Sequence, residues 1–181
     1  MTADPWLIPV LTLRRQPGAR RQECRTGRIG ELSVAGSVVP ASAEATADAI
    51  LDAVDGGIEV VARIHAPWEG ECRRCLRPLG SELHCEVREL YRTRTADEAA
   101  DPDEDTYPLD GDQLDLRPLV RDALLLALPL APLCRDDCLG LCPACGADRN
   151  VDPCGCQAAA GDPRWGALDV LRSPEGEPGL G

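Results

Sequence analysis

The sequence predicts an α+β protein, in which a mainly antiparallel β domain precedes a C-terminal helix and a cysteine-rich zinc knuckle. Three observations support this class. Apolar and polar residues alternate in several segments of the first half, which is typical of strands with one buried face. Leucines recur at helical spacing in LVRDALLLALPL, and six of the ten cysteines follow within residues 134–156. A chain of 181 residues has room for one core domain with a small appendage.

Residues 1–94 are expected to form the β domain, with an arginine-rich N-terminal arm and a turn that carries the motif CRRC. Segment 42–54 is ambiguous, because its alanines favour a helix whereas its period-two spacing favours a strand. The DGG that follows, and the alternation after it, favour a hairpin. Residues 16–30 are rich in Pro, Gly and Arg and are predicted to be a loop or mobile arm. Strands are expected at residues 6–13, 42–54, 58–66 and 83–91, with CRRC on the connection between the last two.

The second half contains the predicted helices. Residues 95–108 are acidic and carry few large apolar residues, so we expect a linker or disordered loop. Residues 109–172 are expected to hold a helix over 117–128, the zinc knuckle and a short terminal helix over 162–171, before a disordered tail at 173–181. Asp115 is the expected N-cap of the first helix, with Pro118 in its first turn and Pro129 after its end.

The expected compartment decides how the cysteines are interpreted. The N-terminus lacks the pattern of a signal peptide, and the longest apolar run, residues 123–133, is too short to span a membrane. A cytoplasmic location is therefore expected. In that reducing compartment, clustered cysteines indicate metal binding before disulfides.

Charge is distributed unevenly along the chain. The formal net charge is −12, and all of it arises after residue 94, because the first half has as many arginines as acids. An acidic protein is a poor generic binder of nucleic acid, although local contact with RNA remains open. The acidic half also suits a basic protein partner. The candidate RNA-binding residues are the bunched arginines Arg14, Arg15, Arg20, Arg21, Arg73, Arg74 and Arg77.

Eight of the ten cysteines occur in close pairs: Cys72/Cys75, Cys134/Cys138, Cys142/Cys145 and Cys154/Cys156. A structural Zn²⁺ takes four ligands in a tetrahedron, so eight cysteines suffice for two structural zinc ions. The preferred partition joins the first two pairs across the fold and leaves the last two pairs as a local knuckle. The other partition gives Cys134, Cys138, Cys142 and Cys145 to one ion, and spacing does not exclude it.

Other uses of the cysteines are weaker interpretations. An iron–sulfur cluster takes the same ligands, and metal-free thiols could simply be buried. A thioredoxin-like centre would place CxxC at the start of a helix, whereas CRRC here lies between strands. A zinc deaminase would leave most cysteines unexplained, and His84 and Glu86 are better interpreted as residues on one face of a strand. His65 is likewise interpreted as a packed or surface residue, and Cys24 and Cys85 as bystanders.

The order of these motifs resembles the YceD family of bacterial and plastid proteins. The resemblance rests on CRRCL (72–76), DLRPLVRDALLLALPLAPLC (115–134), CLGLCPACGADRN (138–150), CGC (154–156) and DPRWGALDVL (162–171), with RRQPGARR near the N-terminus. Some members keep only the first two cysteine pairs, which supports the preferred partition.

The resemblance implies a non-enzymatic role in accumulation of large-subunit (23S) ribosomal RNA, and hence in large-subunit biogenesis. The expected partner is a large-subunit precursor, through its rRNA or a ribosomal protein, with no membrane and no small-molecule substrate. Zinc would be structural, because saturated four-cysteine sites leave no position open for a substrate. The alternatives are a chaperone for a basic ribosomal protein and a zinc enzyme that acts on RNA.

Overall fold

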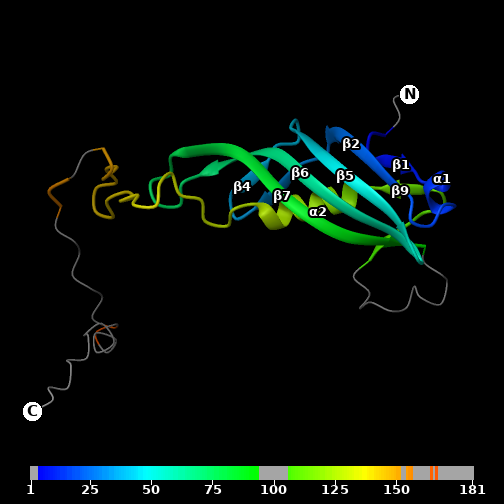
Figure 1. Ribbon diagram of the computed structural model, residues 1–181. Helices are drawn as coiled ribbons and strands as arrows, with labels where there is room; N and C mark the ends of the chain where they lie inside the picture. Colours follow the sequence, from blue (N-terminus) through cyan, green and yellow to red (C-terminus); the bar gives the residue numbers. More distant parts are fainter. Residues whose placement is uncertain (1–3, 94–105, 152–153, 157–163, 165, 167–181) are drawn as a thin grey trace, which may run out of the picture.

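A twisted antiparallel sheet dominates the computed structural model, which describes residues 4–93, 106–151, 154–156, 164 and 166 (Figure 1). The α+β class is confirmed: the sheet is mostly antiparallel and is followed by one longer helix. The elements are β1 (Leu7–Pro9), α1 (Leu11–Arg14), β2 (Arg20–Arg28), β3 (Leu32–Val34), β4 (Ser37–Val39), β5 (Glu44–Val54), β6 (Gly57–Glu71), β7 (Pro78–Arg92), β8 (Tyr107–Pro108), β9 (Gln113–Asp115) and α2 (Arg117–Ala127).

The predicted hairpin of residues 42–54 and 58–66 is confirmed as β5 and β6. These strands pair from Thr46↔His65 to Val54↔Gly57, with Gly56 at φ 78° in the turn. A longer hairpin follows, because β6 also pairs with β7 over its whole length, from Gly57↔Arg92 to Glu71↔Pro78. This second hairpin extends beyond the rest of the sheet and ends in the turn of residues 72–77. It therefore carries CRRC to the far end of the molecule (Figure 1).

The hydrophobic core lies between one face of the sheet and α2. Alternate residues of β5 and β6 are buried, and on β5 most of them are alanines. Helix α2 buries Leu119, Val120, Ala123 and Leu124, and it packs on β3, β6 and β7. Trp6 and Tyr91 are the largest fully buried side chains, so two of the chain's few aromatics fill a core that is otherwise aliphatic.

The predicted loop or arm at residues 16–30 is wrong for most of its length. Residues 20–28 form β2, which pairs with β5 from Arg20↔Asp52 to Arg28↔Glu44. The composition of these residues favours a loop. Without them the outer edge of β5 would be unpaired, and pairing within the folded sheet outweighs the local preference for a loop. Gly27 leaves room for Pro5, whose Cγ would lie 2.7 Å from a Cβ at that position.

The first predicted strand, residues 6–13, is only partly correct. Strand β1 covers Leu7–Pro9 and pairs with β9, and the chain then turns into the short helix α1. Part of the predicted acidic linker is also ordered, since β8 pairs in parallel with the end of β7. The remainder of that linker, the predicted helix at 162–171 apart from Arg164 and Gly166, and the tail at 173–181 lie outside the described residues.

Helix α2 begins at Arg117, as the sequence predicts. The N-cap is Leu116 rather than Asp115, but the Asp115 carboxylate still accepts a hydrogen bond from the Arg117 amide at 2.9 Å. After the helix, the Pro129 carbonyl accepts a 2.6 Å hydrogen bond from the buried Ser37 hydroxyl. This contact holds the start of the following segment against β4. Among the described residues, neither helix has the length and hydropathy that a membrane crossing requires.

Candidate metal centres

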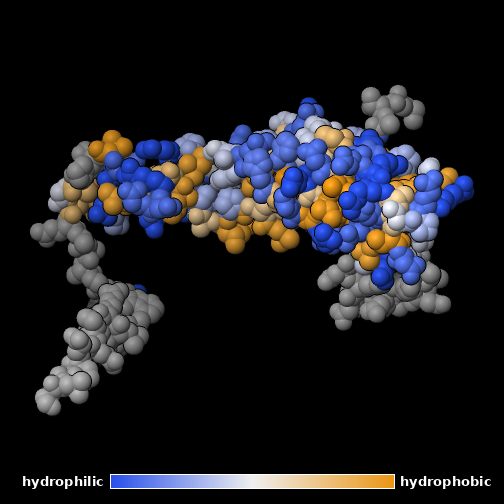
Figure 2. Space-filling model, in the orientation of Figure 1, coloured by the Kyte–Doolittle hydropathy of each residue, from blue (hydrophilic) through white to orange (hydrophobic). Residues whose placement is uncertain are grey.

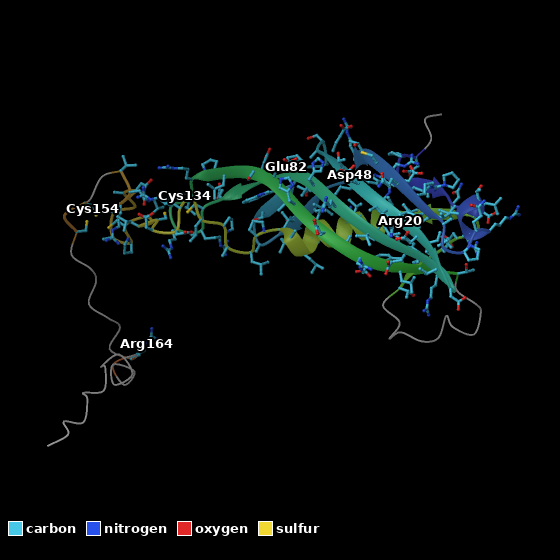
Figure 3. All side chains as sticks on the ribbon, in the orientation of Figure 1. Arg20, Asp48, Glu82, Cys134, Cys154 and Arg164 are labelled. Carbon is cyan, nitrogen blue, oxygen red and sulfur yellow. The ribbon has the colours of Figure 1, made fainter. Side chains whose placement is uncertain are left out.

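Two groups of four cysteines lie at the tip of the long hairpin. The first, here called the inner cluster, comprises Cys72, Cys75, Cys134 and Cys138. The second, the outer cluster, comprises Cys142, Cys145, Cys154 and Cys156 and lies farther from the sheet (Figure 3). The structure thus groups the eight cysteines according to the preferred partition and does not bring the alternative set together.

The inner cluster is assembled from segments far apart in the sequence. Cys72 and Cys75 lie in the turn between β6 and β7, where the Cys72 amide donates to the Arg77 carbonyl at 2.8 Å. Leu76 adopts a left-handed backbone in this turn, with φ 59°. The segment after α2 supplies the other two sulfurs. The Arg73 amide donates to the Pro132 carbonyl at 2.9 Å and holds that segment beside the turn.

The spacing of the sulfur atoms suits a single tetrahedral ion. In each cluster the four Sγ atoms lie within 4.8 Å of one another. The Cys72–Cys138 and Cys75–Cys134 Sγ separations are 3.8 and 3.7 Å. Four sulfurs at about 2.3 Å from one zinc ion would be about 3.8 Å apart. In an iron–sulfur cluster, cysteine sulfurs that bind different iron atoms lie farther apart than these do. All ten cysteines are free of disulfides.

Backbone amides favour ionisation of selected thiols. Burial disfavours the Cys72 thiolate, but amides of Cys75, Cys134 and Arg74 stabilise it and lower its pKa to about 6. In the outer cluster, amides of Cys145 and Ala144 similarly lower the pKa of Cys142 to about 6.

Other thiols shift the opposite way. Burial, with the neighbouring thiol of Cys138, raises the pKa of Cys134 to about 12. Hydrogen bonds with Cys145 and Cys154 raise the pKa of Cys156 to about 12. One thiolate disfavours a second negative charge beside it, and a bound dication removes that penalty. Either cluster could therefore hold a metal ion, and the donor set of four soft sulfurs suits Zn²⁺.

The two clusters differ in burial. Cys72, Cys75 and Cys138 are buried and Cys134 is half-buried, whereas Cys145 and Cys156 of the outer cluster are exposed. The outer cluster is built on a small turn in which the Cys142 amide donates to the Ala147 carbonyl and the Gly146 amide to the Cys142 carbonyl, both at 2.8 Å. The outer metal would therefore be more accessible to chelators.

Asn150 contacts a sulfur of the inner cluster, and the sequence did not mark it as a site residue. Its side-chain amide donates to Cys138 Sγ at 3.4 Å, while its Oδ1 accepts from the Leu139 amide at 2.8 Å. The only signal was its position at the end of CLGLCPACGADRN. Gly140 matters for a steric reason, because it has φ 70° and a Cβ there would lie 2.9 Å from the Arg74 carbonyl oxygen.

The seven candidate RNA-binding arginines fall at opposite ends of the molecule (Figures 1 and 3). Arg14 and Arg15 lie at the end of α1, and Arg20 and Arg21 on β2. Arg73, Arg74 and Arg77 lie in the hairpin turn beside the inner cluster. The structure therefore does not join them into one basic surface.

Most of these arginines have intramolecular partners. Arg14 bonds Thr93 and the Gly111 carbonyl, and Arg20 forms a paired contact with Asp52 at 2.6 and 2.9 Å. Arg21 contacts Glu23 and the Pro9 carbonyl. Arg74 donates to the Asp136 and Cys138 carbonyls, and Arg77 pairs with Asp148. Among the described residues, Arg15 and Arg73 make no ion pair or side-chain hydrogen bond.

Cys24 and Cys85 lie on the sheet, away from both clusters. Cys24 is exposed on β2, and a hydrogen bond with Asp48 raises the pKa of its thiol. Cys85 is half-buried on β7, where burial raises its pKa. Both thiols therefore favour the protonated form, unlike Cys72 and Cys142.

The chain is similar along most of its length to mycobacterial proteins. Uncharacterized proteins of Mycobacterium bovis and Mycobacterium tuberculosis are 34% identical over 181 residues, which covers 97% of this chain and 85% of theirs. An uncharacterized protein of Mycobacterium leprae is 29% identical over 178 residues, which covers 95% of this chain and 80% of its own. No solved structure shows a significant match.

One family model matches residues 60–172, and its description is "Large ribosomal RNA subunit accumulation protein YceD". The match begins within β6 and includes most of the long hairpin, α2 and all eight clustered cysteines. The chain therefore belongs to the YceD family.

Proposed function

We propose that this chain is a non-enzymatic, zinc-binding factor that supports accumulation of 23S ribosomal RNA during assembly of the large ribosomal subunit. Membership in the YceD family carries the proposal, because the family is described by large-subunit rRNA accumulation. The two cysteine clusters support the zinc part. Each would be saturated by four thiolates, so neither ion would keep a position open for substrate or water.

The zinc ions would act through folding. The inner cluster joins the hairpin turn to the segment after α2. The apolar set there is small: Cys72, Cys75 and Cys138 are buried, and Leu79, Leu133 and Leu141 pack against them partly buried. Zinc contributes about 10–16 kcal/mol in small peptides, which is comparable to the stability of a whole domain. We propose that zinc holds the tip in the shape that its partner recognises.

A chaperone-like contact with a basic ribosomal protein is the second candidate. It is supported by the intramolecular pairing of Arg14, Arg20 and Arg21, which leaves few cations available for phosphate. The net charge of −12 also favours a basic partner over RNA.

The cellular test compares strains that lack the chain, carry it, or carry variants. The ratio of large- to small-subunit rRNA should fall without the chain and recover with the wild type. A Cys72→Ser/Cys75→Ser variant should not restore it, whereas Cys24→Ser should. An unchanged ratio in the strain without the chain would contradict the proposed role.

A binding experiment separates the two partners. Association of the purified chain with 23S rRNA is measured against salt for the wild type and for Arg15→Gln/Arg73→Gln. Direct phosphate contact predicts a salt slope that is shallower by about 0.7–0.9 per arginine lost. An unchanged slope, together with salt-sensitive binding of a basic ribosomal protein, would favour the protein partner.

A further inference from the structure

Both histidines of the chain lie side by side on the outer face of the sheet, which is the face opposite α2. His65 on β6 and His84 on β7 are direct cross-strand partners. Their rings stack with centroids 6.0 Å apart and an interplanar angle of 25°. The chain has only 2 histidines among its 181 residues, so their meeting depends on the register of the long hairpin.

A carboxylate completes the group. Glu82 precedes His84 by two residues on β7 and therefore shares its face. Its Oε1 lies 2.9 Å from His65 Nδ1, and its Oε2 lies 3.5 Å from His84 Nε2. One carboxylate thus contacts both rings. A hollow of about 280 Å³, lined by both histidines, adjoins the group.

The charges around this group do not oppose a cation. Arg63 lies nearby, but its guanidinium is paired with Glu86 at 2.7 Å. The side chains of His65, His84 and Glu82 are 39%, 71% and 51% exposed, so a hydrated ion can reach them. Figure 3 labels Glu82 on the sheet, well separated from Cys134 and Cys154.

We propose that His65, His84 and Glu82 form a third metal site, which takes a divalent transition-metal ion such as Zn²⁺ or Ni²⁺. Imidazole nitrogen suits these ions, and two imidazoles with one carboxylate form a common open donor set. The strands fix the side-chain bases, because directly opposed residues place their Cβ atoms about 4.5–5.5 Å apart. The rings stack as placed, so one nitrogen of each must rotate toward a shared ion, and the exposure of both side chains leaves room for that rotation.

This site differs in chemistry from the cysteine clusters. It offers nitrogen and oxygen rather than sulfur, and only three protein donors, so it would bind metal more weakly and keep positions open toward solvent. It would therefore load after both clusters and exchange its ion faster.

The test titrates Ni²⁺ into untagged, zinc-loaded chain, since a polyhistidine tag would bind the same ion. Calorimetry should show one Ni²⁺ per chain. His65→Gln and His84→Gln should each weaken binding by about tenfold or more, and Glu82→Gln by a smaller factor. Glu59→Gln is the matched control, because Glu59 lies on the same face of β6 as His65 but pairs with Arg88 away from the histidines, so Ni²⁺ affinity should be unchanged.

Nuclear magnetic resonance gives a second readout. The chain has two histidine rings, and paramagnetic Ni²⁺ should broaden the ring C–H signals of both together at substoichiometric amounts. Zinc content and melting temperature of each variant confirm that the clusters and the fold are intact. The proposal is overturned if Ni²⁺ does not bind at up to millimolar concentration, if the histidine variants bind as the wild type does, or if Glu59→Gln weakens binding equally.

Discussion

At the scale of single residues, the tip is organised by hydrogen bonds to sulfur and to backbone. Amide donors lower the pKa of Cys72 and Cys142, and Asn150 reaches both a sulfur and a neighbouring amide. Cysteine spacing predicted which residues are paired. The spacing could not reveal Asn150 as a link, because that role arises only once the segments carrying Cys138 and Asn150 fold against each other.

Replacing Asn150 should loosen metal binding at the inner cluster. Asn150→Ala removes the donor to Cys138 and the acceptor for the Leu139 amide, so we expect a loss of about 1–3 kcal/mol in unfolding free energy. Zinc release to a colorimetric chelator should also become faster. Asn150→Asp keeps the oxygen that accepts from the Leu139 amide but loses the N–H that donates to Cys138 Sγ. This variant therefore separates the effects of the two hydrogen bonds. Release at the wild-type rate in both variants would exclude this role of Asn150.

Tyr91 should make stability depend on alkaline pH. It is buried, its hydroxyl donates to the Asp115 carbonyl at 3.0 Å, and burial raises its pKa above the ordinary value near 10. The unfolded chain therefore ionises first, so this contribution is present below about pH 10 and is lost as pH rises above that value.

The variant Tyr91→Phe tests this dependence. This substitution should lower the unfolding free energy by about 1 kcal/mol near neutral pH, because one hydrogen bond is lost. Above pH 10 the difference in unfolding free energy between the variant and the wild type should become smaller. Urea unfolding at several pH values measures this difference. A constant difference across the whole range would show that ionisation of Tyr91 does not contribute.

At the scale of elements, the long β6–β7 hairpin connects the sheet to the inner cluster, because its turn carries Cys72 and Cys75. The alternation in β6 and β7, and the DGG turn that joins β5 to β6, were readable from the sequence because each is local. Strand β2 was not, because Arg20, Arg21 and Arg25 look like loop residues until β5 presents an unpaired edge. The same pairing gives Arg20 its partner Asp52, which no local pattern indicates.

The inner cluster should stabilise the junction between this hairpin and the segment after α2. Cys72→Ser should lower the unfolding free energy by several kcal/mol, because one ligand is lost and the metal ion is bound more weakly or released. Cys24→Ser is the matched control, since Cys24 is exposed on β2 and should change stability by no more than about 0.5 kcal/mol. Chemical denaturation of both variants, with metal analysis, makes the comparison. Equal effects would contradict the assignment of Cys72 as a ligand.

At the scale of the whole molecule, the sheet with α2 and the two cysteine clusters occupy opposite ends (Figure 1), and the visible surface is mainly hydrophilic with hydrophobic patches (Figure 2). The sheet and α2 share a continuous core, whereas the tip has only a small buried set in which cysteines predominate. The fold class and the preferred cysteine partition could be predicted from the sequence, although spacing alone left a second partition open. The separation of the two arginine groups could not be predicted, because it depends on how far the hairpin extends.

The metal content of untagged chain purified from cells tests the central claim most directly. Elemental analysis, with native mass spectrometry, should give two zinc ions per chain. Cys142→Ser/Cys145→Ser should lower the value by one and leave the sheet folded. One ion or none in the wild type, iron in place of zinc, or a zinc content that these substitutions leave unchanged would contradict the account.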